Sequence, residues 1–426
     1  MTQRPWTFLF SALILLLALF PLAWVALTNS DLPQFGRYQD EGLYVISAKT
    51  LYESGEYRIA SLPGRPHQTK YQPLFSALLL PVWSGGRAFP DNLQRAAVLS
   101  IGVALAFFSV SFGLARALGF STIAAAVLVA CLATSPRLVY WTLLPIADFL
   151  FAMLILLTFW ILYTKRDAPH WWWVAGGLAA AACLTKVVGA LIIPAVLFAN
   201  WRRKDWRRAV VVTGPAVAAT LAWTIWSQQH RAGGENSVLW YYTDYVAFHV
   251  RTGGLAALPE FVYRNTFGLV EAVGGFVYYD LPSSITGRAI SAALLAGAVS
   301  GARRLLRRTG AVEYVTFCVL LTMVLLTWNF NPTCRLLAPA MPLLAMALFE
   351  EARHIGGLIR QGMSSAKVGD RVVAHSFAAL GVCGWIAAFT LNVQFVVVGI
   401  PGLLAIDRAA LKDTLPIYEW CKRSLP

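Results

Sequence analysis

The chain has 426 residues, of which 58% are hydrophobic and only 13% are charged. Soluble domains carry about 25% charged residues, so a water-soluble fold of this size would have a largely apolar surface, and disorder and a collagen-like fold are excluded by the same figures. The composition predicts an all-α polytopic membrane protein.

The net charge of +14 has two physical explanations, nucleic-acid binding and the cytoplasmic loops of a membrane protein. The basic residues occur in short groups between apolar runs, as at Arg202–Lys204 and Arg303–Arg304. This is the distribution that the positive-inside rule describes, and no soluble segment carries a basic face interleaved with base-stacking aromatics. The charge therefore predicts membrane orientation and no nucleic-acid partner.

The first apolar run, from Trp6 to Leu27, is longer than a signal-peptide core and has no small-x-small cleavage site after it, so we expect a retained helix. Further spans are expected near 96–115, 122–141, 146–164, 171–185, 187–200, 208–228, 286–302, 311–328, 334–350 and 373–397. The chain is thus predicted to have about 11 transmembrane helices.

The apolar stretch from Pro73 to Gly85 is short for a spanning helix, which needs about 20 residues. Counting it as a span would place the Arg-rich loops outside. We therefore interpret it as an interfacial segment, which leaves the larger excess of basic residues on the inner side.

Two segments on the predicted outer side are long, residues 28–95 and 229–285, within a single transmembrane domain of residues 1–426. Loops longer than about 15 residues usually carry function. We expect the first segment to hold a catalytic motif. The second is dense in aromatic residues between Trp240 and Tyr279, Tyr245 among them, and is expected to form short interfacial helices that cover a cavity.

The first outer segment contains an acidic pair, Asp40 and Glu41, at the start of a helix that is expected to end at Gly55. Asp40 either points into the space above the bundle or caps the helix, and Glu41 either acts with it or complements the helix dipole. Farther on, Lys70 is suited to bind a phosphate as a point charge or to snorkel to lipid headgroups. His67 alone is a weak metal candidate.

Three later charged residues are expected at the outer rim. Asp148 lies where a span begins, and carboxylates at membrane depth are costly and usually retained for function. Lys186 is at a tight turn between two short helices, where snorkelling is the alternative. Arg335 is expected to begin a span, either beside an anion-binding helix N-terminus or as a plain interfacial anchor.

This ordered set of motifs resembles the membrane glycosyltransferases of the C-type fold (glycosyltransferase family 39-like), with protein O-mannosyltransferases and lipid A aminoarabinose transferases as the most similar members. The resemblance covers about residues 5–350. The motifs that carry it are Asp40–Glu41 with Tyr44, Ala48, Leu51 and Gly55, then Lys70–Tyr71–Gln72–Pro73–Leu74, Ser135–Pro136, Asp148, Thr185–Lys186 and Arg335–Leu336–Leu337–Ala338–Pro339.

The resemblance implies transfer of a sugar, with inversion, from a polyprenyl-phosphate donor to a hydroxyl of a glycan, lipid or protein acceptor. The reaction is expected at the outer (periplasmic) face of the membrane. The sequence has no Asn-x-Ser/Thr site, which favours a bacterial inner membrane.

Asp40 is then expected to be the general base, a role that contributes about 10²–10⁴-fold. Cationic groups are needed where the phosphate departs, and the candidates are Lys70, Arg335 and Lys186. Tyr44 and Tyr71 are candidates for contacts with sugar or acceptor. Asp148 is expected to orient the acceptor or to share a divalent ion with Asp40 and His67. Glu41, also a catalytic candidate, is either a second ligand or a helix-start acid.

Two alternatives remain, a secondary transporter or lipid flippase and a non-catalytic scaffold. A transporter predicts internal repeats and buried mid-bilayer ionisable residues, whereas no repeat is found and the candidates gather at one face. Of the six cysteines, Cys334 and Cys421 are both expected on the outer side, and the sequence does not decide whether they form a disulfide.

Overall fold

The computed structural model describes residues 5–86, 88–232, 237–244, 248, 254–365, 368–411 and 415–425. The regular structure of these residues is helical, apart from an isolated antiparallel bridge between Arg58 and His67. The predicted all-α fold is therefore confirmed. Tyr245 lies outside the described residues.

Most of the chain forms a bundle of helices, and most of these follow the predicted apolar runs. In chain order the helices of the bundle are α1 (Pro5–Thr28), α4 (Leu93–Ala117), α5 (Thr122–Ala133), α6 (Pro136–Thr142), α7 (Asp148–Thr164), α8 (Pro169–Cys183), η2 (Val187–Leu191), α9 (Ile192–Arg203), α10 (Trp206–His230), η3 (Leu255–Ala257), α13 (Leu258–Val277), η4 (Leu281–Ser283), α14 (Ile285–Thr309), α15 (Val312–Leu326), α16 (Met341–Ser365), α17 (Val368–Gln394), the π-helical turn η5 (Phe395–Gly399) and α18 (Ile400–Ala410). The exceptions are η3, α13 and η4, which lie in the second outer segment, and α18, which lies beyond the last predicted run; α13 has 20 residues and is longer than the short helices expected there.

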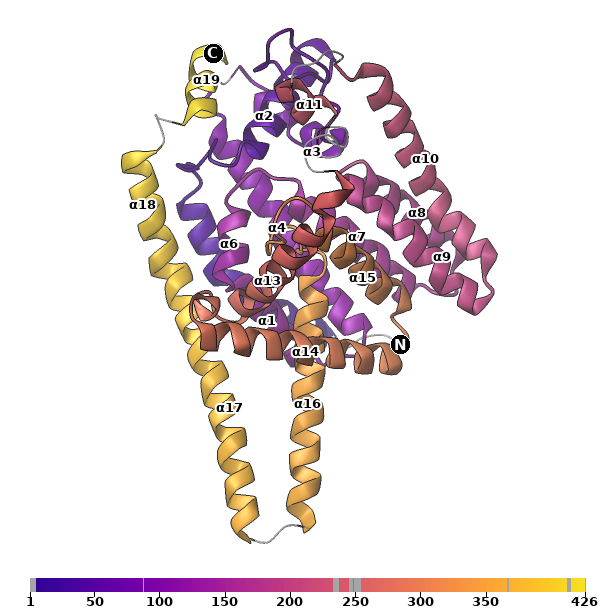
Figure 1. Ribbon diagram of the computed structural model, residues 1–426, viewed down its shortest axis with the longest axis vertical. Coiled ribbons are helices and arrows are strands. Elements are labelled where there is room, and N and C mark those ends of the chain that lie inside the picture. The colour runs from indigo at the N-terminus through magenta and orange to yellow at the C-terminus, as the bar shows by residue number, and fades with distance from the viewer. Residues whose placement is uncertain are drawn as a thin grey trace.

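Short helices gather at one end of the bundle. They are α2 (Asp40–Ser54), α3 (Pro73–Leu78), η1 (Leu80–Trp83), α11 (Ser237–Thr243) and α19 (Pro416–Ser424). Figure 1 shows α2, α3, α11 and α19 at this end, whereas α16 and α17 extend as a long hairpin beyond the opposite end. The α3–η1 pair is the segment expected at the interface.

Five helices in the described parts of the chain are long and apolar enough to cross a membrane. A sixth is added if α5 and α6 are one broken span. The expected number of 11 stays a prediction, because α7 and α15 are apolar but shorter. On α1, Leu16, Leu17 and Phe20 are exposed, and lipid contact explains such an apolar surface.

Several predicted spans have wrong boundaries. The helices α14 and α16 extend beyond the expected ends at 302 and 350, to Thr309 and Ser365. Two further errors are explained by proline. The expected span 122–141 is broken by a 70° bend before Pro136, which lacks the N–H that a continuous helix requires. The expected span 334–350 begins only at Met341, since Pro339 restricts the preceding backbone and Pro342 is tolerated only in a first helical turn. Residue 335 therefore lies in a turn and does not begin a helix.

The α2 helix is held firmly against its neighbours. Val45 accepts a hydrogen bond from the indole N–H of Trp83 at 3.1 Å. Gly42 faces Ile417 of α19 so closely that an added Cβ would lie 2.5 Å from its Cδ1 atom. Packing on both sides therefore fixes the position of Asp40, the first residue of this helix.

Candidate active site

Four charged side chains from distant parts of the sequence meet where α2 and α7 begin. Arg335 donates a hydrogen bond to Oδ2 of Asp40, and its Nε lies 3.2 Å from Oδ2 of Asp148. Lys186 approaches the other oxygen of Asp148, at 2.7 Å. The order Asp40–Arg335–Asp148–Lys186 thus alternates negative and positive charge. We call these four residues the charge chain.

The turn before α2 directs the carboxylate of Asp40 into the charge chain. Gln39 has a φ of 66°, in the left-handed region, and the N–H of Asp40 bonds to the carbonyl of Tyr38 at 2.8 Å. Tyr71 donates its hydroxyl proton to Oδ1 of Asp40 at 2.5 Å. Both carboxylate oxygens of Asp40 therefore accept hydrogen bonds.

Asp148 and Lys186 are positioned by the ends of neighbouring helices. Asp148 is the first residue of α7, where a carboxylate is stabilised by the helix dipole, and it is buried. Lys186 follows α8 in extended conformation. The carbonyl of Leu184 accepts the N–H of Leu74 at 3.0 Å, which joins the end of α8 to the start of α3.

Arg335 is held by the turn that precedes α16 and by an aromatic ring. Its guanidinium lies 5.1 Å from the ring centroid of Trp141 in α6, a cation–π distance. The bend between α5 and α6 therefore has a direct effect on the site, because Trp141 belongs to the second half of that pair.

Burial alone would raise the pKa of Asp40, but the Arg335 charge and the hydrogen bonds from Tyr71 and Arg335 outweigh it and lower the pKa. The two aspartates in turn raise the pKa of Arg335 against the opposing effect of burial. Asp40 is thus an ionised carboxylate at neutral pH, and its charge is balanced by a permanent cation.

Lys70 lies in a cage of tyrosines close to the charge chain. Its ammonium is 3.7 Å from the ring centroid of Tyr241, 5.1 Å from that of Tyr71 and 5.5 Å from that of Tyr242. Burial lowers its pKa to about 8, although Asp40 favours the ammonium form. The cage holds a cation whose charge is only partly screened by water.

The second outer segment reaches the site through α11. The hydroxyl of Tyr242 donates to the side chain of Gln39 at 2.9 Å, and Thr69 donates to the carbonyl of Thr243 at 2.6 Å. The structure thus places α11 against the first outer segment, as Figure 1 also shows.

Three sequence candidates are placed differently from expectation. One oxygen of Glu41 accepts the backbone N–H groups of Gly36 and Tyr38 at 2.9 and 3.0 Å, and burial raises its pKa to about 7. It stabilises the turn before α2, so the helix-start alternative fits and direct participation does not. Tyr44 is buried and packs against the ring of Tyr71, with ring centroids 4.8 Å apart.

His67 is the third. Its ring packs on His230 at 4.6 Å and on Trp226 at 5.8 Å. Among the described residues, no three His, Cys, Asp or Glu side chains form a metal-binding group, so His67 does not join the two aspartates. The guanidinium between those aspartates already supplies the positive charge that a shared divalent ion would, and the donor set does not fit a metal. Cys334 and Cys421 are buried free thiols.

Several contacts were not identified from sequence. Trp141 lies against Arg335, Tyr241 and Tyr242 lie around Lys70, and Gln39 accepts a hydrogen bond from Tyr242. The aromatic density of the second outer segment indicated its general role, but no spacing there distinguishes Tyr241 from its many aromatic neighbours. Trp141 reaches Arg335 because the chain bends between α5 and α6, and the sequence predicted a single continuous span over 122–141.

Comparisons with known proteins identify the fold. A family model described as dolichyl-phosphate-mannose-protein mannosyltransferase matches residues 74–228. No curated protein matches the chain. The archaeal oligosaccharyltransferase AglB from Archaeoglobus fulgidus, solved with an inhibitory peptide and a dolichol-phosphate, is 13% identical with a TM-score of 0.55. That match covers 92% of this chain and 56% of AglB.

The apo form of the same oligosaccharyltransferase gives a TM-score of 0.51 at 13% identity and covers 91% of this chain and 56% of that one. ArnT from Cupriavidus metallidurans, bound to undecaprenyl phosphate, is 15% identical with a TM-score of 0.49 over 98% of this chain and 75% of its own. This chain spans about half the length of AglB, and the similarity between the two is one of fold. The chain therefore shares the membrane fold of AglB, and its residues 74–228 are similar to the mannosyltransferase family.

Proposed function

We propose that the chain transfers a sugar from a polyprenyl-phosphate donor to an acceptor hydroxyl, with inversion, at the periplasmic face of a bacterial inner membrane. The observation that carries this proposal is the position of Arg335, between a carboxylate at the start of α2 and one at the start of α7. A reaction that moves negative charge from a base to a leaving phosphate is favoured by a cation between the two.

In the proposed reaction, the acceptor hydroxyl gives its proton to Asp40 while its oxygen attacks the anomeric carbon. The bond from that carbon to the phosphate oxygen breaks, and its electron pair leaves with the polyprenyl phosphate. Lys70, Arg335 and Lys186 are the cations available to that phosphate. Asp148 keeps Arg335 and Lys186 in place through its two oxygens.

The hydrogen bonds to Asp40 explain how such a base is regulated. With Tyr71 and Arg335 bonded to it, the carboxylate has a lowered pKa and is a weak base. When a donor phosphate attracts the Arg335 guanidinium, Asp40 loses that partner and its pKa rises. Basicity at Asp40 is thereby coupled to the presence of the donor, which limits unproductive chemistry.

The relatives support the donor class. The matching family model is described by a dolichyl-phosphate sugar, and AglB was solved with a dolichol-phosphate. A lipid-linked donor also accounts for a site at the end of a helical bundle, where a polyprenyl tail lies between helices while its phosphate meets the cations.

The test is a deletion strain examined by mass spectrometry of its envelope glycans and polyprenyl-phosphate sugars. We expect the donor to accumulate and one sugar to be missing from the envelope. Wild-type protein and Glu53→Gln, a matched exposed acid on α2, should restore both, whereas Asp40→Asn should restore neither.

Purified Asp40→Asn should still bind the accumulated donor. Turnover by Asp40→Asn at a rate near that of Glu53→Gln would overturn the proposal. A transporter would move lipid with no new glycosidic bond, and a scaffold would be indifferent to both substitutions.

A further inference from the structure

A hollow of about 390 Å³ lies between the first outer segment, α6 and α18. It is lined by Arg37, Tyr38, Tyr140, Leu403, Ile406 and Asp407. Its volume is in the range of small-molecule sites, about 300–1,000 Å³. None of these residues belongs to the charge chain or to the tyrosine cage.

One aromatic layer separates this hollow from the charge chain. The ring of Tyr38 lies 4.6 Å from that of Trp141, and the Trp141 ring lies 5.1 Å from the Arg335 guanidinium. The carbonyl of Tyr38 also accepts the N–H of Asp40. A molecule in the hollow would therefore sit beside the proposed base.

The lining favours a neutral, hydroxyl-rich ligand. Tyr38 and Tyr140 present two rings at 84° with their hydroxyls 3.4 Å apart. Arg37 and Asp407 add one cation and one anion, which cancel, so the hollow has no net preference for a phosphate or an amine. Aromatic faces together with a donor and an acceptor suit the apolar face and the hydroxyls of a sugar ring.

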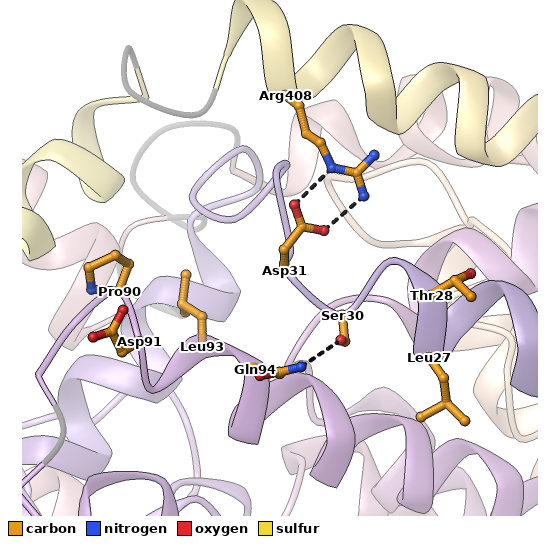
Figure 2. A pocket seen from close by; sticks show the side chains of 9 residues that line it. All are labelled: Leu27, Thr28, Ser30, Asp31, Pro90, Asp91, Leu93, Gln94 and Arg408. Atoms are coloured by element: carbon orange, nitrogen blue, oxygen red, sulfur yellow. Dashed lines mark hydrogen bonds and ion pairs between the residues drawn. The ribbon is translucent and has the colours of Figure 1, made fainter.

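The Arg37–Asp407 pair is a weaker contact than the neighbouring pair on the same helix. One Arg37 nitrogen contacts the two oxygens of Asp407 at 3.3 and 3.5 Å. Arg408, the next residue, forms a bidentate pair with Asp31 at 2.8 Å for each contact, on the wall of a different hollow (Figure 2). Because its contacts are longer, the Arg37–Asp407 pair is able to exchange them for ligand hydroxyls.

The α18 wall of the hollow is apolar and exposed. Leu403 and Ile406 have exposed fractions of 45% and 63%. A tail attached to the sugar would lie along these side chains. We propose that this hollow binds the carbohydrate part of a lipid-linked acceptor, an inference that rests on the proposed transferase function.

The binding test uses the full chain in lipid nanodiscs and needs no turnover. Saturation-transfer NMR titrations compare butyl β-glucopyranoside with methyl β-glucopyranoside, butyl phosphate and butylammonium. We expect butyl glucoside to bind best. Asp407→Asn should weaken it about tenfold or more, as the loss of a charge-assisted hydrogen bond predicts. Tyr140→Leu, which removes a ring and its hydroxyl, should also weaken it, and Tyr140→Phe should weaken it less.

Asp31→Asn is the matched control, since it breaks the other ion pair of α18 outside the hollow, and it should leave butyl glucoside binding unchanged. Equal loss in Asp31→Asn, or stronger binding of either charged probe, would overturn the assignment. Equal binding of methyl glucoside would refute the role of a lipid tail. Asp40→Asn should bind the glycoside normally. Turnover by the same variant tests the catalytic proposal, so the two proposals can fail independently.

Discussion

Replacement of Arg335 by lysine tests the charge chain most directly, because the positive charge is kept and the geometry is lost. The guanidinium uses different nitrogens toward Asp40 and Asp148. A lysine ammonium is a compact point charge without this planar fork, so it cannot keep both contacts in the same arrangement. A hydrogen bond to a charged group contributes about 1.5–3 kcal/mol. Loss of one contact in the transition state should therefore lower kcat/KM by about 10- to 150-fold.

Arg335→Met should have a larger effect, because it leaves two carboxylates without the cation between them. Removing one partner of a buried pair costs about 3–5 kcal/mol, so this variant needs a thermal-unfolding measurement beside its kinetics. In both variants the pKa of Asp40 should rise, since the Arg335 charge that lowers it is displaced or absent. The acid limb of the kcat/KM profile should then move to higher pH.

The assay is transfer from the accumulated donor by purified protein, measured from pH 5 to 9. Arg58→Lys is the control, because Arg58 pairs with exposed Glu56 and such surface pairs contribute little. We expect less than a twofold effect there. If Arg335→Lys retained more than half of wild-type kcat/KM with an unmoved acid limb, the bridging role of the guanidinium would be wrong.

Two further substitutions test other parts of the site. Tyr241→Leu removes the nearest ring of the cage around Lys70, and the apparent KM for the donor should rise about 2- to 30-fold, as a cation–π contact of about 0.5–2 kcal/mol predicts; Tyr241→Phe keeps the ring and should stay near wild type in the same assay. Glu41 has a pKa of about 7 in the folded protein, above its ordinary value of 4.5, so the folded state binds the proton more tightly. Its contribution to stability is complete below pH 4.5 and is lost as the pH rises toward 7. Glu41→Gln should flatten that decline in thermal-unfolding scans, and an unchanged pH slope would contradict the assignment.

The fold was predictable because a chain that inserts into a membrane needs long apolar runs for its spans and basic residues in its inner loops, and both are visible in the sequence. The boundaries were less predictable where proline interrupts those runs. A hydropathy window averages over Pro136 and Pro339, whereas the backbone responds to each of them by ending or delaying a helix. The 70° bend and the late start of α16 are the result.

The site was predictable as a set of residue types and not as a set of contacts. Asp40, Asp148, Lys186 and Arg335 stand out because charges at membrane depth are costly and need a reason. Their alternating order depends on how four separate segments pack, which no local spacing encodes. His67 shows the converse, since it lies three residues before Lys70 in sequence but its ring faces α10.

The charge chain suits the proposed reaction because that reaction moves one negative charge from Asp40 to the departing phosphate. Before transfer, Asp40 and a phosphodiester donor each carry one negative charge. After transfer, Asp40 is neutral and the departing phosphate monoester carries two, so the total is unchanged while one negative charge has moved. Arg335 contacts Asp40 on one side and is anchored by Asp148 on the other. When the donor binds and draws the guanidinium from Asp40, the cation lies beside the phosphate as the second negative charge develops there, so its stabilising effect is greatest in the transition state, where catalysis requires it.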